Sequence, residues 1–344
     1  MAKGLPSIRD VAKAAGVSTA TVSRAISAPE KVSPRTRQAV QAAIRATGYT
    51  INLAARNLRR QETGGIAVLV PNLANPFFAR ILSGIAEIMS QAGTNVLIAD
   101  TAPGINDERR IVEYLGNNRA DGLIVLDGAL PVTTLRDRGD PRSRAPMVFA
   151  CEWIPDLPRP TVRIDNHAAA ALAVRHLLGL GHRRIGHVAG PPGNVLTEAR
   201  RAGTAAALRA AGLDLRPDWL LEGDFSMRSG VAAAERWLRL PDRPTAMFCA
   251  SDEMAMGFIG ALHRAGLSVP GDVSVVGFDD IEFAEYGVPP LTTVHQPRTE
   301  IGRAAAELLL ARIRARRGEA AEIPQLRELP VELVVRASTA PPPG

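Results

Sequence analysis

From Gly65 onward, short apolar runs rich in β-branched residues alternate with longer segments whose apolar residues recur at helical spacing. Runs of this kind are typical of strands that are buried on both faces. Regular alternation of strand and helix therefore predicts an α/β architecture in which helices cover parallel sheets. The predicted strands occupy residues 66–70, 95–100, 122–126, 147–150, 161–164, 184–190, 246–250, 274–278, 291–294 and 332–336.

This strand–helix plan starts twice. The segments "GGIAVLVPN…FFARILSGIAEIMSQAG" and "RRIGHVAGPP…TEARRAGTAAALRAAG" each read as a strand, a polar loop, a helix and a terminating glycine. We predict a body of residues 64–340 with two doubly wound parallel-sheet subdomains. The first covers about 64–164 and 293–324, and the second covers about 165–292 and 325–340. The final residues, "TAPPPG", are expected to be disordered.

The segment before this body is strongly basic. Residues 1–62 hold 11 Lys and Arg against 3 Asp and Glu, a surplus of +8, whereas the remaining residues hold 30 basic and 32 acidic side chains. A compact basic segment on a near-neutral body predicts a head that binds a polyanion. Its periodic apolar residues favour a folded domain at residues 1–50, with a linker at 51–63, over a solvated basic tail.

Three short helices are expected in the head. Ser7, Ser18 and Ser33 are each placed to cap one of them, and Gly16 and Gly48 end the first and the third. Helices joined by a glycine-containing turn match the geometry of a helix-turn-helix. An ordinary three-helix interaction module is the alternative.

The second helix lies within "STATVSRAIS", residues 18–27, and is rich in small hydroxyl side chains that are mediocre helix formers. Val22 and Ile26 can dock it on the first helix, so its poor propensity is tolerated. Small outward side chains such as Ala20 would let DNA approach closely, and Arg24 is long enough to reach O6 and N7 of guanine. This helix is therefore predicted to read bases in the major groove.

The order and length of these motifs resemble the LacI/GalR family of bacterial transcription repressors. In the head the resemblance lies in "IRDVAKAAGVSTATVSRAI", "KVSPRTRQAVQAAIRATGY" and "NLAARNLRR". In the body it includes "VPNLANPFFARILSGI", "LGHRRIGHVAGP", "PTAMFCASDEMAMG", "VPGDVSVVGFDDIEF" and "PPLTTVHQPRTEIGRAAAELLL". The resemblance implies a homodimer that binds a palindromic DNA operator. It also implies a periplasmic-binding-protein-like body that holds a small-molecule effector, a nucleoside or a sugar, between its subdomains.

In the head, the resemblance implies that Thr19, Ala20 and Arg24 read bases. Leu58 is implied to wedge into the minor groove from a hinge helix, or else to pack between the two linkers of a dimer. Ile51 departs from the family, in which proline is common before the hinge helix, so the start of that helix is less fixed. The residues implied to contact the DNA backbone are Thr21, Ser23, Ser33, Arg37, Tyr49 and Asn52.

In the body, the effector site is expected outside the carboxyl ends of the strands. Asp279 follows a strand and can accept two sugar hydroxyls. Phe77, Phe78 and Phe225 can supply aromatic walls, although Phe77 and Phe78 could equally belong to the core. Asp252 is expected to cap the helix that follows it. The other candidate effector contacts, each of which could instead be structural, are Glu152, Trp153, Asn194, Glu198 and Ser251.

Signs of other chemistry are weak. The six histidines are scattered, and no nucleotide-binding or hydrolase motif is present, so neither a metal nor a cofactor is predicted. Cys151 and Cys249 lie in strand-like runs and are expected to be buried thiols. No apolar run approaches the ~18 residues of a membrane span, and the first residues lack an apolar signal core. A cytoplasmic protein is expected.

Two other classes of protein share features of this body. A transport-type binding protein would need a signal peptide and no basic head. An enzyme of nucleoside or sugar metabolism could use Asp279 and Asp280 as paired carboxylates. Adjacent residues at a strand end point apart, however, and no nucleophile–base pair accompanies them. The sequence therefore favours a DNA-binding regulator.

Overall fold

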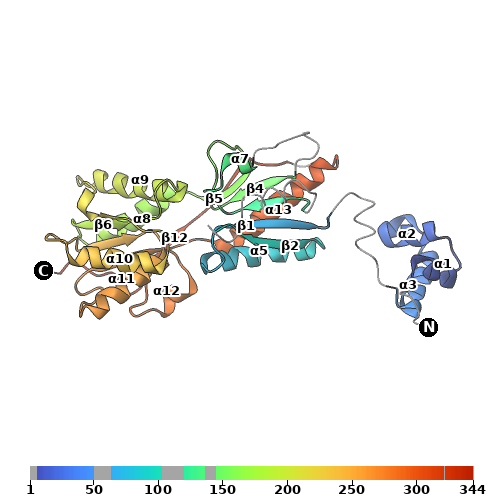
Figure 1. Cartoon of the computed structure of the whole chain (residues 1–344), viewed down its shortest axis with the longest axis horizontal. Helices are drawn as coiled ribbons and strands as arrows, with labels where there is room; N and C mark the ends of the chain where they lie inside the picture. The colour runs from blue at the N-terminus through green and yellow to red at the C-terminus, as the bar shows by residue number, and fades with distance from the viewer. Residues whose placement is uncertain (1–5, 50–62, 103–119, 136–144, 321, 344) are drawn as a thin grey trace. The chain divides into compact units, whose positions relative to one another are not determined.

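The structure is a computed structural model that describes residues 6–49, 63–102, 120–135, 145–320 and 322–343 (Figure 1). The chain divides into two compact units, Met1–Glu62 and Thr63–Gly344. Ile51, Asn52 and Leu58 lie outside the described residues, as does the rest of the predicted linker up to residue 62.

The described residues 6–49 of the head unit contain three helices that begin and end where the sequence predicts them. The hydroxyls of Ser18 and Ser33 accept hydrogen bonds from the N–H groups of Thr21 and Thr36 and so cap the second and third helices. Gly16 ends the first helix in the left-handed conformation that favours glycine. The helices are α1 (Ile8–Ala15), α2 (Thr19–Ser27) and α3 (Pro34–Thr47), with a 3-10 turn η1 (Pro29–Lys31) before α3.

A small apolar core joins these helices. Val11, Val22 and Val40 come from one helix each, and each is at most 1% exposed. Alanines at positions 12, 25 and 43 complete the buried cluster. The core thus holds α2 by its inner face, which compensates for the weak helix propensity of its hydroxyl-rich sequence.

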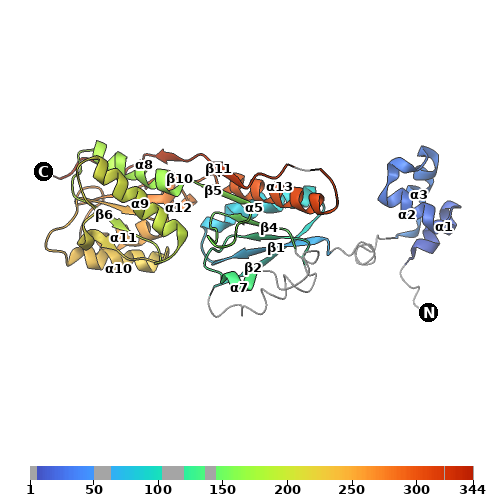
Figure 2. The ribbon, with the colours of Figure 1, turned by 90° about the horizontal axis from the view of Figure 1, so that it is seen from above.

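The body unit contains two six-stranded sheets, one at the centre of each subdomain (Figure 2). The first sheet has the strand order β11-β5-β4-β3-β1-β2, and all its pairs are parallel. The sequence predicts all of its strands except β11. They are β1 (Gly65–Val70), β2 (Asn95–Asp100), β3 (Leu123–Val125), β4 (Met147–Ala150), β5 (Thr161–Ile164) and β11 (Leu326–Leu329).

Two helices of the first subdomain, α5 (Phe77–Gln91) and α13 (Arg298–Arg316), pack tightly against each other. Glycines make this approach possible. A Cβ atom on Gly84 would lie 2.2 Å from the carbonyl oxygen of Thr299, and one on Gly302 would lie 2.1 Å from that of Ile81. A short helix, α7 (Val132–Leu135), follows β3.

The second sheet has the order β12-β10-β9-β8-β6-β7, and β12 runs antiparallel to β10, unlike the other, parallel pairs. Its strands are β6 (Ile185–Val188), β7 (Leu220–Leu221), β8 (Ala246–Cys249), β9 (Ser274–Asp279), β10 (Thr292–His295) and β12 (Glu332–Val334). The accompanying helices are α8 (Asn166–Gly179), α9 (Val195–Ala210), η3 (Pro217–Trp219), α10 (Met227–Leu238), α11 (Asp252–Arg264) and α12 (Glu282–Tyr286).

Two of the predicted subdomain boundaries need correction. β10 lies in the second sheet, although the sequence places residues 293–324 in the first subdomain. β11 lies in the first sheet, although residues 325–340 are predicted in the second. The side chains of β11 are mostly exposed and include Arg327 and Glu328. Because β11 joins the sheet by backbone pairing with β5 rather than by burial, its sequence shows no apolar run.

The carboxyl-terminal segment lies along the second sheet, contrary to the expected disorder. Ser338 is fully buried, and its carbonyl oxygen accepts a hydrogen bond of 2.9 Å from the N–H of Val275. The Nε2 atom of His182 lies 2.8 Å from the carbonyl oxygen of Ala340. Hydrogen bonds rather than apolar side chains hold this segment, so hydropathy does not reveal it.

Candidate functional sites

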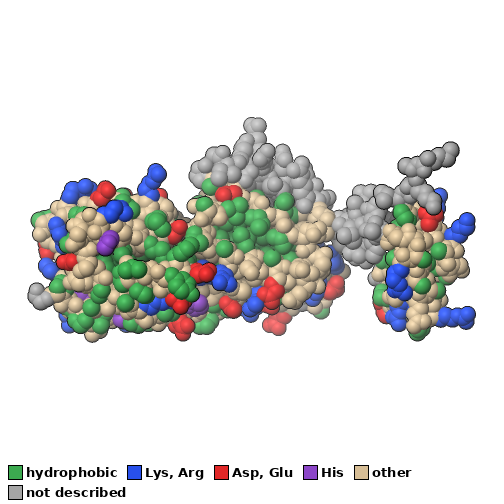
Figure 3. All heavy atoms as spheres, turned by 90° about the horizontal axis from the view of Figure 1, so that it is seen from below, with side chains coloured by type: hydrophobic (Ala, Val, Ile, Leu, Met, Phe, Trp, Pro, Cys, Tyr) green, Lys and Arg blue, Asp and Glu red, His purple; other side chains and the backbone are tan. Residues whose placement is uncertain are grey.

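The outer face of α2 carries the residues predicted to read bases. Thr19, Ala20 and Arg24 are exposed, whereas Val22 is fully buried. Lys and Arg side chains project from the head (Figure 3). The helix therefore presents small side chains and one long cation, which is the combination that close approach to a major groove requires.

The residues predicted to contact the DNA backbone have mixed surroundings. Thr21 and Ser23 are half-buried on α2, and Arg37 is half-buried on α3. Ser33 is exposed and caps α3 through its hydroxyl. Tyr49 packs against the core of the head. Ser33 and Tyr49 thus have structural functions of their own, beside any contact with DNA.

A buried ion pair lies at the carboxyl ends of the strands of the second sheet. The Nη1 atom of Arg200, on α9, is 4.0 Å from Oδ1 of Asp279, the last residue of β9. Arg200 is 2% exposed and Asp279 is 7% exposed. Burial raises the pKa of Asp279, while the charges of Arg200 and Arg298 act in the opposite direction. The site thus offers a hydroxyl-accepting carboxylate beside a guanidinium donor.

Arg200 is fixed from several sides. Its Nε donates to Oδ1 of Asn166 at 2.9 Å, and its Nη1 donates to the carbonyl oxygen of Ala250. The guanidinium carbon lies 3.8 Å from the ring centroid of Phe278 and 5.7 Å from that of Phe225. These contacts offset the cost of burying the cation and leave it little freedom to move.

Backbone strain is concentrated in this region. Among the described non-glycine residues, those with positive φ are Cys151, Phe225, Asp279 and Asp280. Asp279 ends β9 and Asp280 follows it, and Phe225 places its ring beside Arg200. Such conformations persist where the surrounding structure holds them, and they cluster at binding sites.

Asp252 supports the strained turn and does not cap its helix, which corrects the expectation from the sequence. Its Oδ1 accepts a hydrogen bond of 2.6 Å from the hydroxyl of Thr293, and its Oδ2 accepts one of 2.9 Å from the N–H of Ile281. Ser251, predicted to contact the effector, caps α11 by accepting from the N–H of Met254. Asp252 therefore fixes the backbone just after Asp279.

Asp280 faces a different environment from Asp279. Its Oδ1 accepts a hydrogen bond of 2.8 Å from Nη2 of Arg336, and its Oδ2 lies 2.9 Å from Nδ1 of His295. Oδ1 of Asp279 instead accepts a hydrogen bond of 2.7 Å from Nε2 of Gln296. The two carboxylates therefore do not share a site, as the sequence predicts for neighbours on a strand.

A hydrogen bond joins predicted site residues of the two subdomains. Oε1 of Glu152, just after β4, accepts a bond of 3.1 Å from Nδ2 of Asn194, which caps α9. Oε2 of Glu152 accepts a bond of 2.8 Å from the N–H of Gly128. Burial raises the pKa of Glu152, and the positive charge of Arg200 counteracts this. Glu152, Asn194, Arg200 and Asp279, with Phe225, form what we call the inter-subdomain site.

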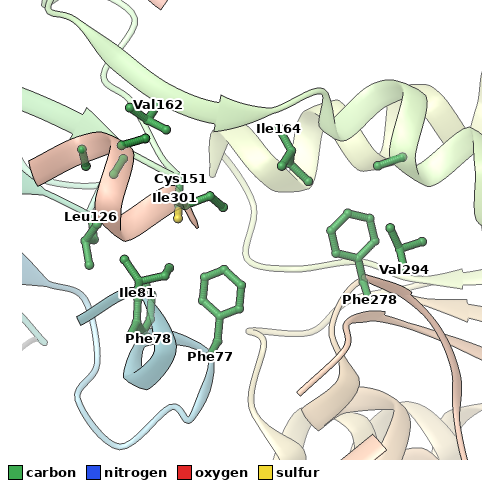
Figure 4. Close-up of a cluster of buried hydrophobic side chains, with 14 of the residues drawn as sticks. Phe77, Phe78, Ile81, Leu126, Cys151, Val162, Ile164, Phe278, Val294 and Ile301 are labelled. Carbon is green, nitrogen blue, oxygen red and sulfur yellow. The ribbon is translucent and has the colours of Figure 1, made fainter. Parts of the chain in front are cut away.

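Phe77 and Phe78 lie within an apolar cluster, which favours the core alternative for them. Each is 7% exposed, and their rings meet edge to face at 5.1 Å. Figure 4 shows them beside Ile81, and Leu126 and Cys151 belong to the same cluster. Cys151 and Cys249 are both buried free thiols, as expected.

The remaining predicted contacts are less closely tied to the site. Trp153 is half-buried, and the guanidinium of Arg163 lies 4.3 Å from its ring centroid. Glu198 is exposed and forms an ion pair with Arg201 on its own helix. Among the described residues, no group of three possible ligands could hold a metal ion.

Arg200 and Asn166 are absent from the sequence prediction. The signal for Arg200 is its place on a helical stripe that it shares with Leu196, Thr204 and Ala207, which are all buried. A cation on a buried stripe of a helix needs a partner, so it marks a candidate site. Asn166 carries no comparable signal, because an asparagine beside Asp165 also reads as an ordinary helix start.

A helix-turn-helix head joined to a two-subdomain body with a polar site at its strand ends defines a class: DNA-binding regulators that carry an effector-binding domain. This chain belongs to the lacI family of bacterial regulatory proteins. The family model matches residues 7–52, and a periplasmic binding protein-like domain matches residues 174–339. None of the described helices is long and apolar enough to cross a membrane.

Curated relatives extend over almost the full chain. The chain is 41% identical to the HTH-type transcriptional repressor CytR of Escherichia coli (strain K12) over 332 residues, 96% of each protein. It is 35% identical to the HTH-type transcriptional repressor PurR of Photobacterium profundum over 97% of this chain and 98% of that one. Within the family, the segments "STATVSRA" and "EGDFSMRSG" resemble the cytidine-repressor type.

Solved structures share the fold. The lac repressor dimer bound to operator and the anti-inducer ONPF has a TM-score of 0.82 at 30% identity, covering 98% of this chain and 99% of that one. The complex of the transcriptional regulator CelR with cellobiose has a TM-score of 0.72 at 34% identity, covering 97% and 99%. The protein is thus a LacI-type DNA-binding transcription regulator.

Proposed function

We propose that this regulator is a homodimeric, cytoplasmic repressor whose affinity for a palindromic operator is set by a nucleoside or sugar in the inter-subdomain site. The buried pair of Arg200 and Asp279 carries this proposal. A carboxylate can accept two hydroxyl hydrogen bonds while the guanidinium donates to an oxygen, which suits a vicinal diol. The ring of Phe225 supplies an apolar face beside the pair.

The similarity to sugar-bound regulators supports this class of effector. One structure with a TM-score of 0.71 and 31% identity over 80% of this chain is a LacI family regulator from Enterococcus faecium with bound ribose. The CelR structure contains cellobiose. A pentose, free or as part of a nucleoside, and a hexose therefore remain the candidates that an experiment must separate.

For the head, we propose that Thr19, Ala20 and Arg24 read bases, and that Thr21, Ser23, Ser33, Arg37 and Tyr49 position the backbone. Asn52 and Leu58 complete this interface in the proposal. Two heads in a dimer would read half-sites about one helical turn apart. The lac repressor dimer bound to operator is a similar assembly.

We further propose that the chain is not an enzyme. The separate surroundings of Asp279 and Asp280 speak against a carboxylate pair that shares a reacting atom. Incubation of the pure protein with candidate nucleosides should give no products by chromatography. Turnover that disappears with Asp279→Asn would support the enzyme alternative.

A thermal-shift panel tests the effector class. Individual nucleosides, pentoses and hexoses are added to the full-length protein, since a ligand at 100 times its Kd adds about 2.7 kcal/mol to stability. A ligand that raises Tm should also change operator affinity. A panel in which no compound raises Tm, or a stabilising compound that leaves operator affinity unchanged, would contradict the proposal.

A further inference from the structure

The last turns of α13 carry an unusual density of cations. The sequence "ARIRARRG", residues 311–318, places four arginines in the last two turns of the helix and at its cap. Arg314, Arg316 and Arg317 are exposed, and Arg312 is half-buried. A helix carboxyl terminus favours a cation, but this effect falls off within the last turn. The dipole of α13 therefore explains part of this cluster only.

Arg312, within this cluster, has unfavourable surroundings. The Nε atom of Arg312 is buried without a hydrogen-bond partner. Burial lowers the pKa of Arg312, and the nearby charge of Arg159, which lies just before β5, lowers it further. Five arginines gathered at one place raise the local positive potential, which attracts a polyanion. We call Arg159, Arg312, Arg314, Arg316 and Arg317 the basic edge.

The basic edge lies at the end of the first subdomain where the chain enters from the head. A Cβ on Gly122, just before β3, would lie 3.2 Å from Ile313, so α13 ends beside the amino ends of the strands. At the same amino ends of the strands, the carboxylate of Asp121 accepts hydrogen bonds from the N–H groups of Thr63 and Gly64 at 2.7 and 2.8 Å. Figures 1 and 2 both show α13 and the start of β1 at this end.

We propose that the basic edge binds phosphates of the operator duplex and thereby adds a sequence-independent contact from the body. Thr63, which lies at the same end of the subdomain as the basic edge, is separated from the third helix of the head by residues 48–62 alone. A guanidinium can engage a phosphate with two parallel hydrogen bonds, and DNA offers a regular row of such groups. This contact goes beyond the effector-controlled function and needs no effector.

The test compares two triple variants of the full-length protein. Arg314→Gln, Arg316→Gln and Arg317→Gln remove three exposed charges from the basic edge. Arg236→Gln, Arg239→Gln and Arg264→Gln remove three exposed charges from the ends of α10 and α11 in the second subdomain, so they control for net charge and helix dipoles. Affinity is measured without effector, on an operator duplex selected by the wild-type protein and on a random duplex, from 50 to about 300 mM salt.

The salt dependence decides the outcome. Each lost phosphate contact should reduce the magnitude of the slope of log K against log salt by about 0.9. At 0.1 M salt, this change corresponds to an affinity that is about eightfold weaker. We expect the basic-edge variant to show a smaller slope and a weaker affinity on both duplexes. The control variant should keep the wild-type slope. Equal losses in both variants, or an unchanged slope in the first, would overturn the proposal. An acidic protein partner for the edge predicts the unchanged slope.

Thermal unfolding separates contact from misfolding. Both variants should melt within a few degrees of the wild-type protein, because the substituted side chains are exposed. Operator binding by the wild-type protein, measured in the same series, separates the failure of this proposal from the failure of the effector proposal. Effector-independent operator binding by the wild type would defeat the effector proposal and leave the basic edge testable.

Discussion

Nη1 of Arg200 and Oδ1 of Asp279 lie 4.0 Å apart in a place that is almost closed to water. A buried cation beside a buried carboxylate is costly to assemble, and replacing it by apolar residues is often stabilising. Its position at the strand ends of the second sheet, beside strained backbone at Asp279 and Phe225, supports the proposed binding of an effector there.

Asp279→Asn should abolish the response to effector and leave operator affinity unchanged. An amide donates where the carboxylate accepts, so one hydroxyl of the effector meets a mismatched partner at a cost of about 1–3 kcal/mol. Effector titration by calorimetry should therefore show a Kd that is weaker by about 5- to 150-fold. A titration identical to that of the wild type would remove Asp279 from the site.

Effector affinity should fall as the pH is lowered through about 6. Burial raises the pKa of Asp279 to about 6, so at lower pH the free protein carries a protonated carboxyl. A protonated carboxyl accepts fewer hydrogen bonds, so the hydroxyl groups of the effector bind it more weakly below this pH. Above this pH the carboxylate is ionised and effector affinity reaches its full value. Calorimetry between pH 5 and 8 measures the trend, and Asp279→Asn should flatten it. A profile that is flat in the wild type would contradict the assignment.

Asn194→Ala should destabilise the body more than the loss of a helix cap alone. Oδ1 of Asn194 caps α9, a contribution of about 1 kcal/mol. Nδ2 donates to Oε1 of the buried Glu152, and loss of that hydrogen bond leaves a buried acceptor without its partner at a cost of about 1–3 kcal/mol more. Ser226→Ala is the matched control, since Ser226 caps α10 by accepting from the N–H of Ser229. Equal losses of unfolding free energy in urea for the two variants would show that the link to Glu152 contributes nothing.

Arg24→Ala should cost about 1–3 kcal/mol on the operator and relax the preference at one base pair. Arg24 is the long cation on the exposed face of α2, where its neighbours are small. Competition assays with operators substituted at each position measure the preference. If affinity for operator and for random DNA falls by the same factor, Arg24 contacts phosphate and does not read a base.

The sequence predicts the fold well because the apolar runs of the body mark strands, most of which are buried, although β2 is largely exposed. It fails at β11 and at Ser338–Ala340, where hydrogen bonds hold segments that bury little apolar surface. At the site, Asp279 is predictable because it follows a strand end. Arg200, its acceptor Asn166, and Gln296, which donates to Asp279, come from distant segments. Only the folded chain brings them to one place.

Removal of residues 1–62 should leave a folded body that binds effector and has lost its affinity for the operator at 0.15 M salt. The described residues of the head and the body form separate compact units, and Asp121 holds the start of the body at Thr63. The removed segment carries a surplus of +8, whereas the remaining chain is slightly acidic, so most of the attraction to phosphates goes with it. The basic edge alone adds too few contacts to hold DNA at this salt.

Mobility shift measures operator affinity, and calorimetry on the same fragment measures effector binding. Retained operator affinity would overturn the division of labour between head and body. Lost effector binding in a fragment with native circular dichroism would show that the site depends on the head.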